Sequence, residues 1–251
     1  MGEFTGRRVI VMGGSRGIGR SAALAFARAG ASVAICARGA EALEATRREL
    51  EAAGAPTAFA SPVDLAVADD IARFIPAAAD AMGGINVLIN NASGFAATDD
   101  DAGWAASFNV DMLATVRASH AALPYLERAG DAAIVNVSSI SALRATKRNP
   151  PYAAIKAAID SYTASQARIL ADRGIRANAV APGSIEFPGG VWDQRRRDNP
   201  ELYNATLAQI PFGRMGHPEE VAELIVFLAS RRASWITGQS IAVDGGQLLG
   251  S

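Results

Sequence analysis

Short β-type runs alternate with longer helical patterns along the whole chain. The expected strands are Arg8–Met12, Ser32–Ala37, Thr57–Pro62, Ile85–Asn90, Ala132–Ser138, Ile175–Ala181 and Ser240–Val243. The expected helices between them are Ile18–Arg28, Ala40–Ala53, Val67–Ala81, Trp104–Arg128, Tyr152–Arg173 and Pro218–Ala229. Such alternation is typical of a parallel sheet covered by helices on both faces. We therefore predict an α/β fold with a doubly wound, seven-stranded parallel sheet of Rossmann type.

The whole chain, residues 1–251, is expected to form a single domain. Half of its residues are hydrophobic, which is enough for one large core without disulfides or a metal. We find no linker, repeat or compositional step that would mark a second domain. One long irregular stretch, 182–215, breaks the pattern, and we predict that residues 185–215 form a partly helical flap over a pocket.

Charge and cysteine content exclude several kinds of function. The 24 basic and 25 acidic residues give a net charge of −1, so we expect neither nucleic acid nor a membrane as a partner. Two histidines and one cysteine, Cys36, are too few for the usual zinc or iron–sulfur sites, so no metal is expected. No signal peptide is recognisable and no apolar run approaches the roughly 18 residues of a membrane span. A cytoplasmic protein is the expectation.

A glycine-rich segment, residues 13–19, connects the first expected strand to an Ala-rich helix. Glycines at this place let the backbone turn sharply and approach a pyrophosphate, whose charge the helix N-terminus stabilises. A tight turn without a ligand is the plainer interpretation, but its position as the first βα turn favours nucleotide binding. The segment also matches the Gly-x-Ser-x-Gly elbow of serine hydrolases, with Ser15 as nucleophile and His217 as base. That alternative has no upstream oxyanion loop and leaves Gly19 unexplained.

Polar residues follow the third and fourth expected strands. Asp64 either caps the next helix or accepts a hydrogen bond from an adenine amino group. Asn91 and Ala92 either form a simple turn or bind a ligand. Ligands of open parallel sheets bind at the carboxyl ends of the strands, where these residues are expected.

Ser139, Tyr152 and Lys156 form the most specific pattern in the sequence. Tyr152 and Lys156 are four residues apart on one expected helix, so their side chains share a face. Ser139 lies at the end of the fifth expected strand. A nearby ammonium favours the phenolate and lowers a tyrosine pKa by roughly 1 to 3 units, which makes the phenol a usable acid or base near neutral pH.

Together, the glycine-rich turn and this pattern resemble the short-chain dehydrogenase/reductase family, and in particular its 3-oxoacyl carrier-protein reductase-like branch. The resemblance spans about Gly6 to Gly246. It also rests on the segments 108–110, 178–183, 236–239 and 244–246, whose residues are Phe-Asn-Val, Asn-Ala-Val-Ala-Pro-Gly, Ile-Thr-Gly-Gln and Asp-Gly-Gly.

The resemblance implies an NAD(P)(H)-dependent oxidoreductase that interconverts a ketone, or a 3-oxoacyl group, and a secondary alcohol. It implies a tetrad of Asn109, Ser139, Tyr152 and Lys156: Tyr152 exchanges the proton, Ser139 binds the same oxygen, Lys156 also binds the nicotinamide ribose, and Asn109 holds a water. A buried asparagine at a helix kink is the alternative for Asn109. The implied cofactor-binding residues are Gly13, Ser15, Arg16, Gly17, Ile18, Gly19, Arg38, Asp64, Leu65, Asn91, Ala92, Tyr152, Lys156, Pro182, Gly183 and Ile185. A sensor that binds dinucleotide without chemistry is a further alternative, but such relatives typically lack the tyrosine or the lysine.

Three residues depart from the family pattern. Met12 stands in place of a threonine, Ser93 in place of a glycine, and Phe187 where the family has a hydroxyl near the nicotinamide amide. The contact of that hydroxyl must come from elsewhere, or Phe187 faces the substrate. We expect Ser141, Phe187 and Trp192 to bind the small-molecule carbonyl or alcohol substrate.

The end of the second expected strand predicts a preference for NADP(H), with NAD(H) also possible. Ala37 stands where NAD-selective members have an acid, and Arg38 follows it. Arg16 reaches the 2′-phosphate of NADP(H) from the glycine-rich turn, unless both arginines are solvated or paired with Glu41 or Glu44.

The run 195–197 of three arginines is either a contact for an acidic substrate or a solvated helix face. The resemblance and the apolar C-terminal run imply a homotetramer.

Overall fold

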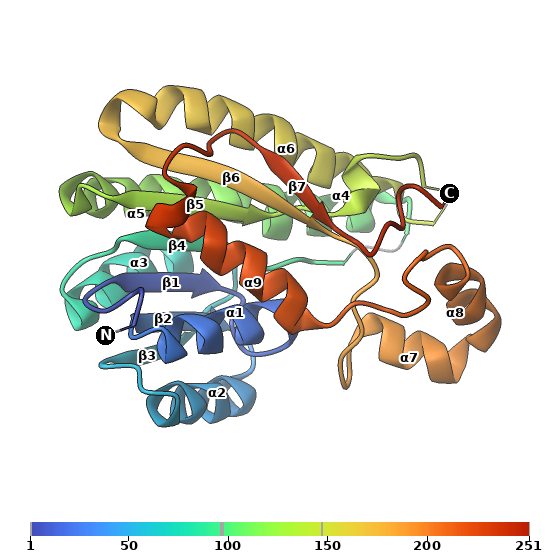
Figure 1. Ribbon diagram of the computed structural model, residues 1–251, viewed down its shortest axis with the longest axis horizontal. Helices are drawn as coiled ribbons and strands as arrows, with labels where there is room; N and C mark the ends of the chain where they lie inside the picture. The colour runs from blue at the N-terminus through green and yellow to red at the C-terminus, as the bar shows by residue number, and fades with distance from the viewer. Residues whose placement is uncertain (1, 96–97, 147, 251) are drawn as a thin grey trace.

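The computed structural model describes residues 2–95, 98–146 and 148–250, and within them seven strands form one sheet (Figure 1). The strands are β1 (Arg8–Met12), β2 (Ser32–Ala37), β3 (Ala58–Pro62), β4 (Val87–Asn90), β5 (Ala132–Val137), β6 (Ile175–Pro182) and β7 (Ser240–Val243). All pairings are parallel, in the order β3-β2-β1-β4-β5-β6-β7. The predicted doubly wound, single-domain α/β fold is confirmed.

Helices cover both faces of this sheet. They are α1 (Gly17–Arg28), α2 (Ala40–Ala52), α3 (Ala68–Met82), α4 (Asp101–Ser107), α5 (Ala114–Ala129), α6 (Pro150–Leu170), α7 (Val191–Asp198), α8 (Pro200–Leu207) and α9 (Pro218–Ala229). Side chains of α1, α2 and α9 pack on one face, and those of α3, α5 and α6 pack on the other. The alternation of side chains in β1 serves both cores, since Val9 and Val11 face the first group of helices and Ile10 and Met12 the second.

The predicted helix Trp104–Arg128 is wrong as a single regular helix. The segment starts earlier, at Asp101, and a π-helical stretch, Phe108–Leu113, separates α4 from α5. A π-helix places one extra residue in a turn, which changes the direction in which the side chains project and is frequent at functional sites. Hydrophobic periodicity alone did not reveal this insertion.

The flap (residues 185–215) is partly helical, because it contains α7 and α8. Figure 1 shows these two helices projecting beyond the sheet, on the side towards which the strands point. A parallel bridge between Ile185 and Gly216 joins the two ends of the flap. Helix α7 buries no residue and α8 buries only Thr206, so these two helices pack weakly on the body, whereas Ile210 and Met215 after them are buried.

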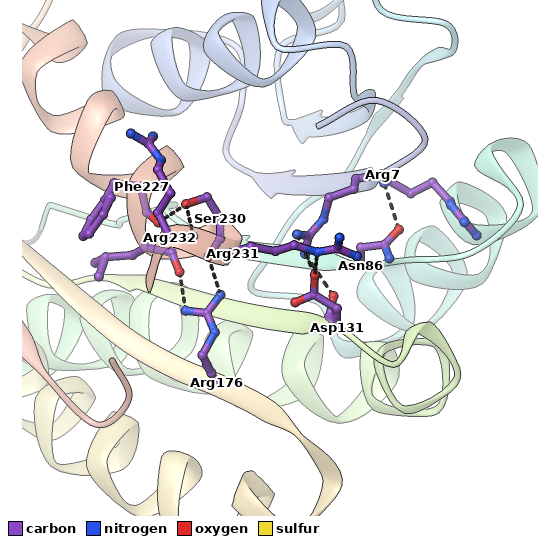
Figure 2. A network of polar contacts seen from close by, with 10 residues as sticks. Arg7, Asn86, Asp131, Arg176, Phe227, Ser230, Arg231 and Arg232 are labelled. Atoms are coloured by element: carbon purple, nitrogen blue, oxygen red, sulfur yellow. Dashed lines mark hydrogen bonds and ion pairs between the residues drawn. The ribbon is translucent and has the colours of Figure 1, made fainter. Parts of the chain in front are cut away.

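The opposite end of the sheet is closed by a network of arginines (Figure 2). Arg7 and Arg231 both donate to the carboxylate of Asp131, at N···O distances of 3.1 and 2.7 Å. Arg176, which is buried in β6, donates to the carbonyl oxygen of Ser230 just after α9. These contacts fix the amino ends of β1, β5 and β6, and they leave the carboxyl ends free to form a site. No helix in the described part of the chain combines the length and hydrophobicity needed to cross a membrane.

Candidate active site

A cleft of about 1420 Å³ opens at the carboxyl ends of the strands, where the strand order reverses between β1 and β4. Open parallel sheets bind ligands at this topological switch point. The predicted residues that line it are Gly13, Ser15, Arg16, Gly17, Ile18, Arg38, Asp64, Leu65, Asn91, Ala92, Ser139, Ser141, Tyr152, Lys156, Pro182, Gly183, Ile185, Phe187 and Trp192. Two predicted residues, Gly19 and Asn109, are not among the lining residues.

The glycine-rich turn leads into the N-terminus of α1 at one end of the cleft. Gly17 has a φ of +55°, and a Cβ on Gly19 would collide with the carbonyl oxygen of Gly13, so Gly19 acts by letting α1 pack closely on the turn. Asn91 holds the turn against β4 by donating to the Gly13 oxygen at 2.8 Å. No side chain caps α1 and its first turn has no acidic residue. The free N–H groups and the helix dipole therefore fit a pyrophosphate, as a nicotinamide dinucleotide requires.

The outer rim of this end is cationic. Arg16 and Arg38 are exposed, line the cleft and form no ion pair with the described residues. Glu44, one of the acids considered as their partner, instead pairs with Arg47 and Arg48. The guanidinium groups of Arg16 and Arg38 are therefore available to bind an anionic group beside β2.

Asp64 serves the local turn at the end of β3. Its Oδ1 accepts from the Ala66 amide at 3.0 Å, while the residue also lines the cleft. The predicted helix-capping role is wrong, because α3 begins at Ala68 with Val67 as its N-cap and Asp64 lies before it; the ligand contact stays a prediction.

Tyr152, Ser139 and Lys156 line the middle of the cleft. The Ser139 Oγ accepts from the Ser141 amide at 3.1 Å, which leaves its hydroxyl hydrogen available to a ligand. The Lys156 ammonium lies 5.5 Å from the centre of the Tyr152 ring, as their spacing on α6 predicts. Phe95 stacks on the same ring at 5.8 Å between centroids.

Asp111 is a site residue that sequence reasoning missed. Its Oδ1 lies 3.0 Å from the Nζ of Lys156, and both side chains are almost completely buried. The other oxygen, Oδ2, accepts from the Gly94 amide at 2.8 Å, and Nζ also donates to the Val137 carbonyl at 2.9 Å. Burial opposes the charged form of Lys156, but the charges of Asp111 and Tyr152 outweigh it and raise the pKa of the lysine. The ammonium thus donates one hydrogen bond, to Val137, beside its ion pair with Asp111, and it retains donor capacity towards the cleft.

Asn109 lies in the π-helical stretch, two residues before Asp111. Its carbonyl accepts from the Ala114 amide in the wide turn, and its half-buried side chain forms no hydrogen bond with the described residues. The π-helix thus contains both the predicted Asn109 and the unpredicted partner of Lys156.

Phe187 packs across the cleft from the flap onto the glycine-rich turn. A Cβ on Gly17 would lie 2.6 Å from its ring and one on Gly190 would lie 2.9 Å away, so the ring fits between two glycines. Trp192 also lines the cleft and meets the Tyr203 ring edge-on at 6.5 Å.

Gln247, near the C-terminus, supports the turn after β6 and was also missed. It is buried, its Oε1 accepts from the Ser184 amide at 2.9 Å, and its Nε2 donates to the Ser184 Oγ at 3.1 Å. The Asp-Gly-Gly motif that precedes it was the available signal.

Comparison with known proteins agrees with this geometry. The family model described as "Enoyl-(Acyl carrier protein) reductase" matches residues 13–247. The isoepoxydon dehydrogenase patN of Penicillium expansum is 35% identical over 98% of this chain and 96% of its own length. The 3-oxoacyl-[acyl-carrier-protein] reductase FabG of Thermotoga maritima is 36% identical over 98% of this chain and 100% of its own length. The chain belongs to the short-chain dehydrogenase/reductase family.

Solved structures of this family superpose closely on the chain. A putative short-chain alcohol dehydrogenase from Sinorhizobium meliloti has a TM-score of 0.91 at 34% identity and covers 98% of this chain and 97% of its own. A 7α-hydroxysteroid dehydrogenase complexed with NADH and 7-oxo glycochenodeoxycholic acid has a TM-score of 0.90 at 29% identity, with coverage of 97% and 94%. The predicted family, with its 3-oxoacyl reductase-like character, is confirmed.

Family membership and geometry both oppose the serine hydrolase alternative. Ser15 lines the cleft, but His217 lies at the N-cap of α9 and is not among the lining residues. The backbone amide of His217 donates to Glu220 at 2.8 Å, which is a helix-capping contact. Ser15 therefore has no histidine base in the cleft.

Proposed function

We propose that the protein interconverts a ketone and a secondary alcohol, using a nicotinamide dinucleotide and the tetrad Asn109, Ser139, Tyr152 and Lys156. The observation that carries this proposal is the position of Tyr152 beside the Lys156 ammonium, in a cleft that begins at an uncapped helix N-terminus. The relatives named as dehydrogenases and reductases support the same reaction class. No specific observation favours a sensor that binds dinucleotide without catalysis, because Tyr152 and Lys156 are both present and lie side by side in the cleft.

The chain's own residues divide the work as follows. Tyr152 gives a proton to the carbonyl oxygen in reduction and takes it back in oxidation. Ser139 donates its free hydroxyl hydrogen to the same oxygen. Lys156 uses its remaining donor capacity for the Tyr152 oxygen or for a ribose hydroxyl, and Asn109 holds a water that resupplies protons. The bound nicotinamide supplies or accepts the hydride.

The decisive test is Tyr152→Phe. It removes the proton donor and little area, so we expect turnover to fall by about 100- to 10,000-fold. Coenzyme binding, measured by NADPH fluorescence, should stay nearly unchanged. Turnover of a carbonyl and alcohol panel at the wild-type rate in this variant would refute the mechanism.

We also propose that NADP(H) is preferred over NAD(H). Arg38 and Arg16 have no ion pair in the described part of the chain, and Ala37 brings no negative charge to the end of β2. A charge-assisted hydrogen bond contributes roughly 1.5 to 3 kcal/mol, so one such contact gives about a tenfold to hundredfold preference.

The coenzyme preference is tested by steady-state kinetics with both coenzymes. Ala37→Asp combined with Arg38→Leu should invert the preference, because it exchanges a cation for an acid that accepts from ribose hydroxyls. A higher kcat/KM with NADH than with NADPH in the unmodified enzyme would contradict this proposal.

A further inference from the structure

Away from the coenzyme end, three more arginines line the cleft. Arg144 and Arg148 lie in the segment between β5 and α6, next to Tyr152, and Arg195 lies on α7 in the flap. None of the three forms an ion pair with the described residues. Among the described lining residues the sole carboxylate is that of Asp64, which belongs to the end of β3. The substrate end is thus positively charged without a counter-charge of its own.

The run of three arginines in α7 is divided by the helix into two different environments. Arg196 and Arg197 both pair with Asp193 at 3.0 Å, and Arg196 also lies 3.4 Å from Glu186. Arg195 projects into the cleft instead, with its guanidinium 4.7 Å from the centre of the Trp192 ring. A solvated helix face therefore describes Arg196 and Arg197 but not Arg195.

Arg195 lies in an environment that is unfavourable for its charge. Burial, and then the nearby charge of Arg148, lower the pKa of Arg195. Two like charges, one on the flap and one in the segment before α6, therefore lie near each other in the lining of the same cleft. An anion between them would relieve the repulsion and gain charge-assisted hydrogen bonds from both.

We propose that the substrate carries an anionic group, a carboxylate or a phosphate, which Arg195 and Arg148 bind while the reacting carbonyl lies at Tyr152. The Trp192 ring packs on the apolar part between the two. This inference rests on the proposed function, because it assigns the substrate class of the same cleft. It is separate from the coenzyme phosphate, because Arg16 and Arg38 come from the turns after β1 and β2.

The experiment compares oxo acids with their neutral methyl esters, using NADPH oxidation as the readout. For an oxo acid that the wild-type enzyme reduces, kcat/KM should be about 10- to 100-fold higher than for the methyl ester of the same acid, since a hydrogen bond to a charged group contributes roughly 1.5 to 3 kcal/mol. A second arm compares coenzyme A thioesters of 3-oxo acids with N-acetylcysteamine thioesters. Selectivity confined to the second arm identifies phosphate as the anion; selectivity in the first identifies carboxylate.

Arg195→Met is the test variant and Arg197→Met is its matched control on the same helix. Methionine keeps the packing on Trp192 and removes the charge. Arg195→Met should lose about 10- to 100-fold in kcat/KM for the anionic substrate, less than about threefold for its neutral partner, and should leave the KM for NADPH unchanged. Arg197→Met should resemble the wild type for both substrates.

Equal kcat/KM for the charged and neutral members in both arms would overturn the inference and leave the proposed function intact. So would equal behaviour of Arg195→Met and Arg197→Met. If no carbonyl or alcohol is turned over, the proposed function fails instead, and calorimetric binding of the same oxo acids to the wild type and to Arg195→Met decides the inference. Binding that is absent in the wild type, or unchanged in Arg195→Met, then overturns it.

Discussion

The charged side chain of Lys156 is buried, and its ion pair with Asp111 offsets the free-energy cost of burying that charge. A buried ammonium without a counter-charge costs several kcal/mol, whereas one that is paired and hydrogen-bonded does not. The pair also fixes the ammonium beside Tyr152, because Nζ is held at 3.0 Å from Asp111 and at 2.9 Å from the Val137 carbonyl. Asp111 is thus a positioning residue, which acts on the reaction through the lysine.

Asp111→Asn should destabilise the protein strongly at neutral pH. Removing one partner of a buried ion pair costs about 3 to 5 kcal/mol in unfolding free energy. The groups that face Lys156 are Asp111, Tyr152 and Asp160, and together they raise the pKa of the lysine above its unfolded value. The stabilisation is therefore complete below about pH 10, the unfolded pKa, and is lost as the pH rises through the folded-state pKa. Denaturant unfolding at several pH values should show a deficit that is largest near pH 7 and shrinks towards pH 11.

A double-mutant cycle with Lys156→Met controls for simple loss of packing. If the charge pair is the cause, Asp111→Asn combined with Lys156→Met is less destabilised than the sum of the two single variants. Strictly additive losses would show that Asp111 contributes by its shape and not by its charge.

At the scale of elements, the two helices of the flap, α7 and α8, are built to move as a unit. The ion pairs of α7 stay within the flap, as in the pairing of Asp193 with Arg196 and Arg197. The flap is tied to the body mainly near its ends: Phe187 packs on the glycine-rich turn, the Phe212 amide donates to the Gly245 carbonyl at 3.3 Å, and Arg214 pairs with Glu220 of α9.

We expect ligands to protect the flap from hydrogen exchange. Gly189 and Gly213, with φ of +71° and +69°, flank α7 and α8 and tolerate the backbone rotations of a hinge. In the free protein the amides of α7 and α8 should exchange faster than those of α9. NADP(H) together with a substrate should slow them, while exchange in β6 stays the same. Equal protection of the flap with and without ligands would contradict this prediction.

Sequence patterns located most elements because their signals are local. The buried run in β1 ends at its predicted residue, and the glycine-rich turn and the start of α9 follow from steric and capping rules. Lys156 was placed beside Tyr152 by helical spacing alone. Its pairing with Asp111 was not foreseen, because it joins residues 45 positions apart through a π-helical stretch that hydrophobic periodicity does not register. The separation of Arg195 from Arg196 and Arg197 likewise depends on which acids the folded flap brings near them.

At the scale of the whole molecule, the two ends of the sheet have different tasks. The amino end is held by buried and paired arginines such as Arg7 and Arg176, whose partners lie on other elements. The carboxyl end has arginines without an ion pair among the described residues and a helix without a side-chain cap, which leave binding capacity for ligands. The amino end thus supports a site in which Arg16, Arg38 and Arg195 have no ion pair among the described residues.

The sides of the molecule carry apolar surface that a monomer would leave in water. Trp235, just before β7, is 98% exposed, and Ile169 on α6 is 61% exposed. A Cβ on Gly238 would lie 3.5 Å from Ala167 of α6, which places the segment before β7 beside this helix. Trp104 and Phe108, around the end of α4, form a second exposed pair at 42% and 47%. Strand β7 is an edge of the sheet, paired only with β6. Exposed aromatic residues and open edges of this kind usually mark contacts between subunits.

We propose a homotetramer in which one contact covers β7 and α6 and a second covers the helices around α4 and α5, since two separate apolar areas are what two different symmetry axes need. Light scattering at micromolar concentration should give about four times the chain mass of 26.0 kDa. Trp235→Arg should reduce this mass, because a guanidinium at the centre of an apolar contact loses hydration without gaining a partner. Because Trp235 lies outside the cleft, the variant should keep its coenzyme affinity, and that affinity serves as the check that it is folded. A monomer mass for the wild type would contradict the proposal. An unchanged mass for Trp235→Arg would show that the contact between subunits does not involve the surface beside β7.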